Sequence, residues 1–326
     1  MRIFVTGGTG FTGAALVSRL LDDGHSVSVL DNKSGLILDK LKERGADVSI
    51  GSVTDREAVA RGVAGADVVM HLAAAFRETG APDSLYKAVN VEGTKIVVQE
   101  SVSAGVKKFV YCSTQGVHGN VDTPPGDEES PIAPADYYQQ SKYEGELEVS
   151  ENAGGMEYTI LRPTAIYGPG DPERFWMIYK RVDKGRFLMF GGGNTFYHPV
   201  YIDNLVDAFV LAMEPGAGSG EAYIIADEHY YPIRELVARV GKALEKDVWI
   251  PNFPIAPLIV AGHICEKFCK PFGINPLIFP RRVDWFRQVR AFKIDKAQRD
   301  LGYDPKIGID EGLRRTGEWY KEEGNL

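Results

Sequence analysis

Short apolar runs alternate with amphipathic stretches through the first half of the chain. Near-continuous apolar character, as in these runs, is typical of strands that are covered on both faces. The expected strands are RIFVT (2–6), SVSVLD (26–31), DVSI (47–50), DVVMHL (67–72), KKFVYCST (107–114) and EYTILRP (157–163).

Helical patterns lie between these runs, and Thr54 with Glu57 forms a capping-box pair before the third of them. The expected helices cover residues 11–23, 36–44, 55–63, 84–104 and 137–152. Strand–helix alternation of this kind predicts an α/β fold with a doubly wound parallel sheet.

The pattern loosens after about residue 165, where turn clusters such as YGPGDP (167–172) appear and only 203–213 and 232–245 look helical. Six prolines interrupt the apolar stretch 248–286, which excludes one long helix. Short helices that cap a pocket and ordinary core with turns both explain it. We expect a first domain of residues 1–165, to which 196–214 return, and a smaller mixed α/β substrate-binding region of 166–195 and 215–326.

Composition narrows the class of protein. With 326 residues, 44% of them hydrophobic, the chain is large enough for a sizeable core, and its net charge of −8 argues against a nucleic-acid partner. Three cysteines favour a reducing compartment, and no metal-ligand set accompanies them. We find neither a signal peptide nor an apolar span of membrane length, so a cytoplasmic protein is expected.

The glycine-rich segment TGGTGFTG (6–13) joins the first strand to the first helix. A bare backbone there lets a pyrophosphate approach the free amides at the helix N-terminus. The predicted cofactor contacts in this segment are Gly7, Gly10, Phe11, Thr12 and Gly13.

Asp31 ends the second strand, 18 residues beyond Gly13. A carboxylate at this position can accept hydrogen bonds from both hydroxyls of an adenosine ribose and would repel a 2′-phosphate. NAD is therefore the expected cofactor rather than NADP, although Lys33 nearby weakens the preference.

The segment DYYQQSK (136–142) presents two tyrosines ahead of one lysine. Residues four apart in a helix share a face, which pairs Tyr138 with Lys142 and leaves Tyr137 for packing or the pocket wall. A nearby ammonium lowers the pKa of a phenol from its ordinary value of about 10. Such a pair can exchange a proton with a secondary alcohol while a nicotinamide exchanges a hydride.

With these motifs in place, the chain resembles the extended short-chain dehydrogenase/reductase family, in its NAD-dependent epimerase/dehydratase and 3β-hydroxysteroid dehydrogenase-like branches. The matching motifs run in family order over about residues 1–215. They are TGGTGFTG, HLAAA (71–75), NVEGT (90–94), YCSTQGVHG (111–119), YYQQSK and LRPTAIYGPGD (161–171).

The resemblance implies a Rossmann-type cofactor domain and a catalytic triad of Thr114, Tyr138 and Lys142, with Ser113 in support and Asn90 near the nicotinamide. It places His71 to Ala75 under the cofactor, with His71 itself structural. Further implied cofactor contacts are Asn32, Ser52, Val53, Leu72, Ala73, Ala74, Pro163 and Thr164. Phe76, Gln115, His118 and Tyr197 are the expected substrate residues, with His118 near the pocket mouth where the family more often has tyrosine.

The substrate is harder to predict. Sugar-nucleotide branches hold a diphosphate with an Asn and an Arg, and the matching positions here are Ala165 and Tyr197, although Arg186, Arg281 or Arg282 could substitute. The segment HPVYIDNLVDAFVLA (198–212) looks more like the 3β-hydroxysteroid dehydrogenase-like branch. The apolar 248–286 region also suits a greasy small-molecule substrate or peripheral contact with a membrane.

Three hypotheses follow. The first is NAD-dependent hydride transfer at the hydroxyl or ketone of an apolar, 3β-hydroxysteroid-like molecule. The second is an NDP-sugar 4-epimerase or dehydratase, acting on a UDP- or dTDP-hexose, and the third is an NAD-binding sensor without turnover, which the intact triad disfavours. The resemblance also implies a homodimer, formed through the helices at 84–104 and 137–152.

Overall fold

The computed structural model describes residues 1–326 apart from 34–36, 77–80, 173 and 270–282. In this part of the chain, seven parallel strands form one central sheet in the order β11-β6-β5-β4-β1-β2-β3. The strands are β1 (Arg2–Thr6), β2 (Ser26–Asp31), β3 (Asp47–Ile50), β4 (Val68–His71), β5 (Lys108–Cys112), β6 (Glu157–Pro163) and β11 (Glu221–Ile225). The doubly wound α/β fold expected from the alternating pattern is confirmed.

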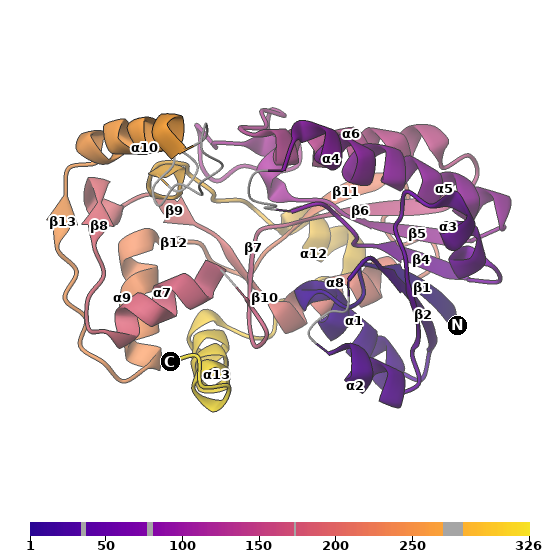
Figure 1. The fold of residues 1–326 in the computed structure, drawn as a ribbon, viewed down its shortest axis with the longest axis horizontal. Helices are drawn as coiled ribbons and strands as arrows, with labels where there is room; N and C mark the ends of the chain where they lie inside the picture. Colours follow the sequence, from indigo (N-terminus) through magenta and orange to yellow (C-terminus); the bar gives the residue numbers. More distant parts are fainter. Residues whose placement is uncertain (34–36, 77–80, 173, 270–282) are drawn as a thin grey trace.

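Helices cover both faces of the sheet (Figure 1). One face carries α3 (Arg56–Val63), α4 (Asp83–Tyr86), the π-helix η1 (Lys87–Gly93), α5 (Thr94–Ser103) and α6 (Tyr137–Asn152). The other carries α1 (Phe11–Asp22), α2 (Leu38–Glu43), α8 (Ile202–Ala212) and α12 (Asp295–Leu301). Two sets of buried apolar side chains fill the spaces between helices and sheet, which explains why the strands are apolar on both faces.

The remaining elements form a smaller lobe beside the carboxyl ends of the sheet (Figure 1). Its helices are α7 (Arg174–Asp183), α9 (Ile233–Ala243), α10 (Ala256–Cys269) and α13 (Ile309–Glu322), with the 3₁₀ turns η3 (Gly191–Gly193) and η5 (Asp284–Phe286). Short strand pairs join β10 (Pro199–Tyr201) to β7 (Ala165–Tyr167), β12 (Tyr231–Pro232) to β9 (Phe196–Tyr197), and β13 (Asn252–Phe253) to β8 (Met189–Phe190).

Three details differ from the expectations. Strand β11 completes the central sheet by pairing with β6, although residues 215–326 were assigned to the substrate-binding region. The helix expected over 84–104 is interrupted by η1. The third helix is capped by Asp55, whose side chain accepts from the amides of Glu57 and Ala58, rather than by a Thr54–Glu57 pair.

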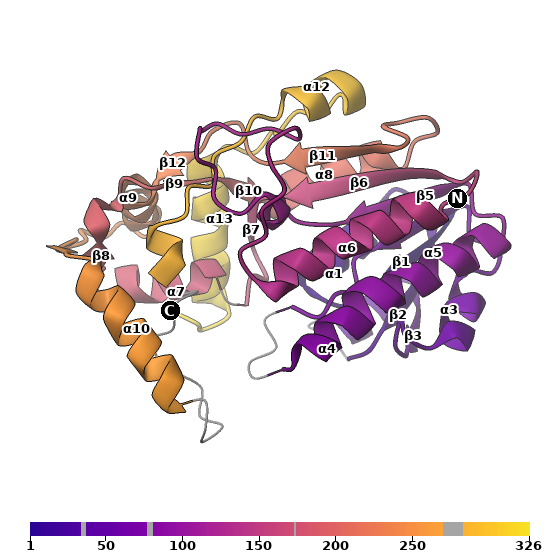
Figure 2. The ribbon, with the colours of Figure 1, turned by 90° about the horizontal axis from the view of Figure 1, so that it is seen from above.

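In the described part of the proline-rich stretch, helix α10 lies at the outer edge of the smaller lobe (Figure 2). It exposes Val260, Ile264 and Phe268, the last at 71%. Residues 270–282, with Arg281 and Arg282, lie outside the described part of the chain. Among the helices that are described, none is both long and apolar enough to cross a membrane.

Candidate active site

The glycine loop lies where β1 ends and α1 begins, next to the point at which the strand order reverses between β1 and β4. Gly7 has a φ of +73°, and a Cβ there would lie 2.7 Å from the Ala73 amide nitrogen. A Cβ on Gly13 would collide with the Gly7 carbonyl oxygen. Gly10 is the N-cap of α1 and offers no side chain to its free amides. These amides are therefore available to an anionic group.

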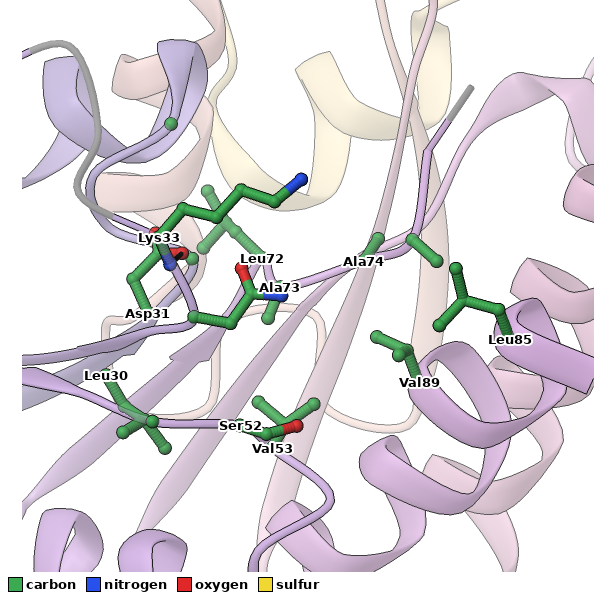
Figure 3. Close-up of a pocket in the computed structure, with 15 residues that line it drawn as sticks. Leu30, Asp31, Lys33, Ser52, Val53, Leu72, Ala73, Ala74, Leu85 and Val89 are labelled. Atoms are coloured by element: carbon green, nitrogen blue, oxygen red, sulfur yellow. Dashed lines mark hydrogen bonds between the residues drawn. The ribbon is translucent and has the colours of Figure 1, made fainter. Parts of the chain in front are cut away.

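A cavity of about 260 Å³ opens beside this loop (Figure 3). Nine of the predicted cofactor residues line it: Gly7, Gly10, Asp31, Asn32, Ser52, Val53, Leu72, Ala73 and Ala74. Leu85 and Val89, from the helical run beyond β4, close one end and were not predicted. The cavity thus occupies the crevice at the carboxyl ends of the strands, where the fold binds dinucleotides.

Asp31 is held on the cavity wall by a residue that the sequence reasoning missed. Its Oδ2 accepts hydrogen bonds from the Thr9 amide (3.0 Å) and the Thr9 hydroxyl (2.8 Å). The position of Thr9 between two glycines was the available signal. The hydroxyl of Ser52, one of the implied cofactor contacts, shares a hydrogen bond of 2.8 Å with the Thr54 hydroxyl.

Helix α6 begins after Asp136, whose side chain accepts from the Gln139 amide at 2.9 Å. This start places Tyr138 one turn before Lys142. The ring of Tyr138 packs edge-on against Phe76 at a centroid distance of 5.0 Å, while Tyr137 packs against Tyr86 at 6.4 Å. Tyr138 also packs edge-on against Tyr86 at 6.4 Å, so the contact with Phe76 is what distinguishes its surroundings from those of Tyr137.

Lys142 is buried, with only 1% of its surface exposed. Its Nζ lies 4.1 Å from the centroid of the Tyr111 ring, and no described residue accepts a hydrogen bond from it. Burial lowers the pKa of the amine to about 8, against the opposing effects of Cys112 and Glu146. An amine in this state retains a hydrogen-bonding capacity that a bound ligand can use.

The hydroxyls after β5 have separate partners. Thr114 Oγ1 accepts from the Gly116 amide at 3.0 Å, so its own proton can be donated to another group. The Ser113 hydroxyl instead donates its proton to Glu146, so it cannot also donate a hydrogen bond to a substrate. The Thr114 proton is therefore available to a substrate while that of Ser113 is used within the protein, and the triad role of Thr114 stays a prediction.

Asn90 is buried, and both hydrogens of its side-chain amide are used in hydrogen bonds within the protein. Its Oδ1 accepts from the Ala75 amide at 2.8 Å, and its Nδ2 donates to the Ala75 carbonyl and to Ser141 Oγ. The side chain joins the segment that follows β4 to α6. These bonds are those of a positioning residue, and a direct catalytic role for Asn90 stays a prediction.

Two expected substrate residues lie in the interior instead. His118 is 2% exposed, and its ring nitrogens contact Arg162 and the Ser130 carbonyl, so it does not stand at a pocket mouth. Tyr197 is fully buried between Phe175 and Trp285 in the smaller lobe. Apolar packing at this point pulls the side chain into the core.

The other predicted residues fall at the carboxyl ends of β5 and β6 or on α1. Gln115 Oε1 and Thr164 Oγ1 are buried, and no described residue forms a hydrogen bond with either atom. Pro163 ends β6. Thr12 lies in the first turn of α1, and Phe11 packs on the turn at Gly170. In the residues described, no cluster of His, Cys, Asp or Glu is suited to a metal ion.

The sequence profile of the NAD-dependent epimerase/dehydratase family matches residues 3–226. The chain belongs to this family. Both features fit the family's dinucleotide cofactor. The glycine loop leaves space that a Cβ would fill, and the buried amine of Lys142 has no hydrogen-bond partner among the described residues.

Individual relatives differ in substrate. The 3-beta-hydroxysteroid dehydrogenase of Mycolicibacterium neoaurum is 32% identical over 345 residues, covering 98% of this chain and 92% of that protein. The 2-alkyl-3-oxoalkanoate reductase of Stenotrophomonas maltophilia is 32% identical over 336 residues, covering 97% and 98%. The structure of UDP-glucose 4-epimerase from Thermotoga maritima with UDP-glucose covers 99% of both chains with a TM-score of 0.81 and 28% identity. The protein is thus an NAD-dependent enzyme of the extended short-chain dehydrogenase/reductase type.

Proposed function

We propose that this enzyme transfers a hydride between NAD and a secondary alcohol or ketone of an apolar substrate resembling a 3β-hydroxysteroid. Bound NAD supplies the hydride acceptor. The Lys142 ammonium stabilises the phenolate form of Tyr138, this phenolate takes the proton of the alcohol, and Thr114 donates a hydrogen bond to the substrate oxygen. The remaining cofactor contacts are those predicted above, led by Gly7, Gly10 and Asp31.

The main support for an apolar substrate is that this chain lacks both residues, an Asn and an Arg, with which the sugar-nucleotide branches hold a diphosphate. Ala165 has no hydrogen-bonding side chain and is buried. Tyr197 is packed among aromatic rings, and Arg186, a possible substitute, is exposed on the surface of the smaller lobe. A diphosphate would therefore lose both a directional amide and a cation. Phe76 against Tyr138 adds apolar surface beside the reacting group.

The second candidate is an NDP-sugar 4-epimerase or dehydratase, which the likeness to the Thermotoga maritima epimerase favours. The two functions differ in their use of the cofactor. A dehydrogenase accumulates NADH, whereas an epimerase or dehydratase returns the hydride and accumulates none.

The test compares wild-type enzyme and Tyr138→Phe with NAD and a panel of 3β-hydroxysteroids, with absorbance of NADH as the signal. Removal of the proton acceptor is expected to lower kcat/KM by about 10²–10⁴-fold. Tyr137→Phe keeps the ring against Tyr86 and is the control that should retain activity. Undiminished turnover in Tyr138→Phe would refute the mechanism. Conversion of UDP- or dTDP-hexose without net NADH would establish the second candidate instead.

The homodimer and peripheral membrane contact stay predictions. On the two helices that would form a dimer, Val102 of α5 and Leu147 of α6 are exposed apolar side chains. The apolar side chains exposed on α10 are where membrane contact would occur. Light scattering after gel filtration tests the first, and co-sedimentation with phospholipid vesicles tests the second.

A further inference from the structure

A chain of buried polar side chains lies directly behind the proposed catalytic residues. Ser113 follows β5, Glu146 is on α6, Arg162 is on β6, and His118 is in the 3₁₀ turn η2 (Gln115–His118). All four are less than 9% exposed. Four separate elements thus meet through charged or polar groups in the interior.

Glu146 is the centre of this buried network. Its Oε1 accepts from the Ser113 hydroxyl and from Arg162 Nε (3.0 Å), and its Oε2 accepts from Arg162 Nη2 (2.6 Å). A bidentate pair of this kind fixes geometry as well as charge. Because Arg162 is itself anchored in β6, the carboxylate is held at a constant position relative to the sheet.

His118 completes the network at the other side of Arg162. Arg162 Nη1 lies 3.1 Å from His118 Nε2, and a guanidinium can only donate, so Nε2 is the acceptor. The ring proton is then on Nδ1, which donates to the Ser130 carbonyl at 2.9 Å. The histidine that departs from the family pattern therefore satisfies the third donor group of Arg162.

Tyr138, Lys142 and Glu146 occupy successive turns of one face of α6, because they are spaced four residues apart. The titratable groups whose charges act on Lys142 come from three elements. His71 is on β4, Tyr111 and Cys112 are on β5, and Glu146 is on α6 itself. Tyr138 precedes Lys142 by one turn. Glu146 is the carboxyl group among them, and it forms an ion pair with Arg162.

We propose that Glu146 is a positioning residue of the active site, which anchors the Ser113 hydroxyl and stabilises the Lys142 ammonium from the next turn of α6. This inference rests on the proposed hydride transfer, since it assigns a supporting role to the same site. Arg162 and His118 hold the carboxylate in place. Glu146 thereby opposes the desolvation that favours the uncharged amine.

The test is Glu146→Gln, which removes the charge and keeps the shape. The pKa of Lys142 should fall by about one unit, because an opposite charge nearby favours the ammonium form. The alkaline limb of the kcat/KM profile should move to lower pH by the same amount. Glu148→Gln is the matched control: Glu148 is two residues along α6 and pairs with Lys95, so both quantities should stay at the wild-type value.

Titration of ¹³C-labelled lysine by NMR, with Lys142 assigned through Lys142→Arg, measures the same shift without any turnover. If wild-type enzyme transfers no hydride but the titration shifts in Glu146→Gln, the proposed function fails and the Glu146–Lys142 coupling stands. An unchanged Lys142 titration in Glu146→Gln overturns the inference. Should that variant not fold, Glu146→Gln with Arg162→Met removes the unpaired buried cation, and the pKa of Lys142 is then expected to fall by less than one unit, because the loss of the cation opposes part of the shift.

Discussion

At the residue scale, the site depends on side chains whose surroundings differ from those of ordinary surface groups. Lys142 is an amine buried against the face of Tyr111, an arrangement in which the ring partly replaces lost water. Asp31 is a carboxylate at the cavity wall, oriented by Thr9. Each is placed by one or two neighbours, so single substitutions can separate cofactor binding from catalysis.

Asp31→Ala is expected to weaken NAD binding by about 10–100-fold, because hydrogen bonds to a charged group contribute roughly 1.5–3 kcal/mol. The preference for NAD over NADP should narrow at the same time, since the carboxylate that repels a 2′-phosphate is gone. Fluorescence titration with NADH and NADPH measures both effects. Asp39→Ala, an exposed carboxylate on α2, is the control, and an equal loss there would contradict the assignment of Asp31.

At the element scale, the position of α6 decides whether Tyr138 and Lys142 reach the site. Gly145 is where this helix approaches its neighbours most closely. A Cβ there would collide with the Tyr111 hydroxyl and lie 2.6 Å from the Asn90 carbonyl oxygen. Asn90 also ties α6 to Ala75 through Ser141. The π-helical turn at Asn90 is thus part of the contact that determines how closely α6 packs against the sheet.

Gly145→Ala should therefore push α6 away from β5 and lower the free energy of unfolding by about 1–3 kcal/mol, as overpacking of a core does. The proposed turnover should fall with it, because Lys142 and Tyr138 move together. Urea denaturation and steady-state rates measure the two effects. Gly155→Ala is the control, since a Cβ there meets no atom within 4 Å. Equal stability of the two variants would show that α6 can accommodate a Cβ at position 145 without moving away from β5.

At the scale of the whole molecule, buried titratable groups make stability depend on pH. Burial raises the pKa of Asp227 to about 7, and its Oδ1 accepts from the Tyr201 amide and Asn204, which connects the end of β11 to α8. Burial lowers the pKa of His198 to about 4, and also lowers the pKa of His71 and of His118. As the pH falls, Asp227 increases the stability of the folded protein and the buried histidines decrease it.

Asp227 binds a proton more tightly in the folded state, so its contribution to stability is complete below about pH 4 and is lost as the pH rises through 7. The histidines bind protons more weakly when folded, so their effect is a loss of stability below about pH 6.5. The contribution of Asp227 is separated from that of the histidines by comparing wild type with Asp227→Asn at each pH. The Tm of wild type minus that of Asp227→Asn should decrease steadily from pH 5 to pH 8. A constant difference would show that Asp227 is already ionised when folded.

Local patterns predicted much of the fold and part of the candidate site. The strands up to residue 163, the glycine loop and the Tyr138–Lys142 pair each depend on residues within a few positions of one another, so periodicity and spacing were sufficient. The same reasoning placed the cap of α3 one residue early and missed the π-helical turn, since both depend on which backbone groups find partners. It also left β11 out of the sheet, because a strand's sheet is decided by its distant neighbour β6.

The amino-acid sequence by itself determined that this protein is a doubly wound α/β enzyme with a dinucleotide loop and a tyrosine–lysine pair. Only the tertiary structure decided that His118 and Tyr197 are interior residues. It also decided that Asn90 links the segment after β4 to α6, and that the Lys142 amine is buried away from solvent. The physical reason is that burial and hydrogen bonding are settled between residues far apart in sequence, such as Arg162 and His118, which are 44 positions apart. Contacts of that separation leave no periodic trace along the chain.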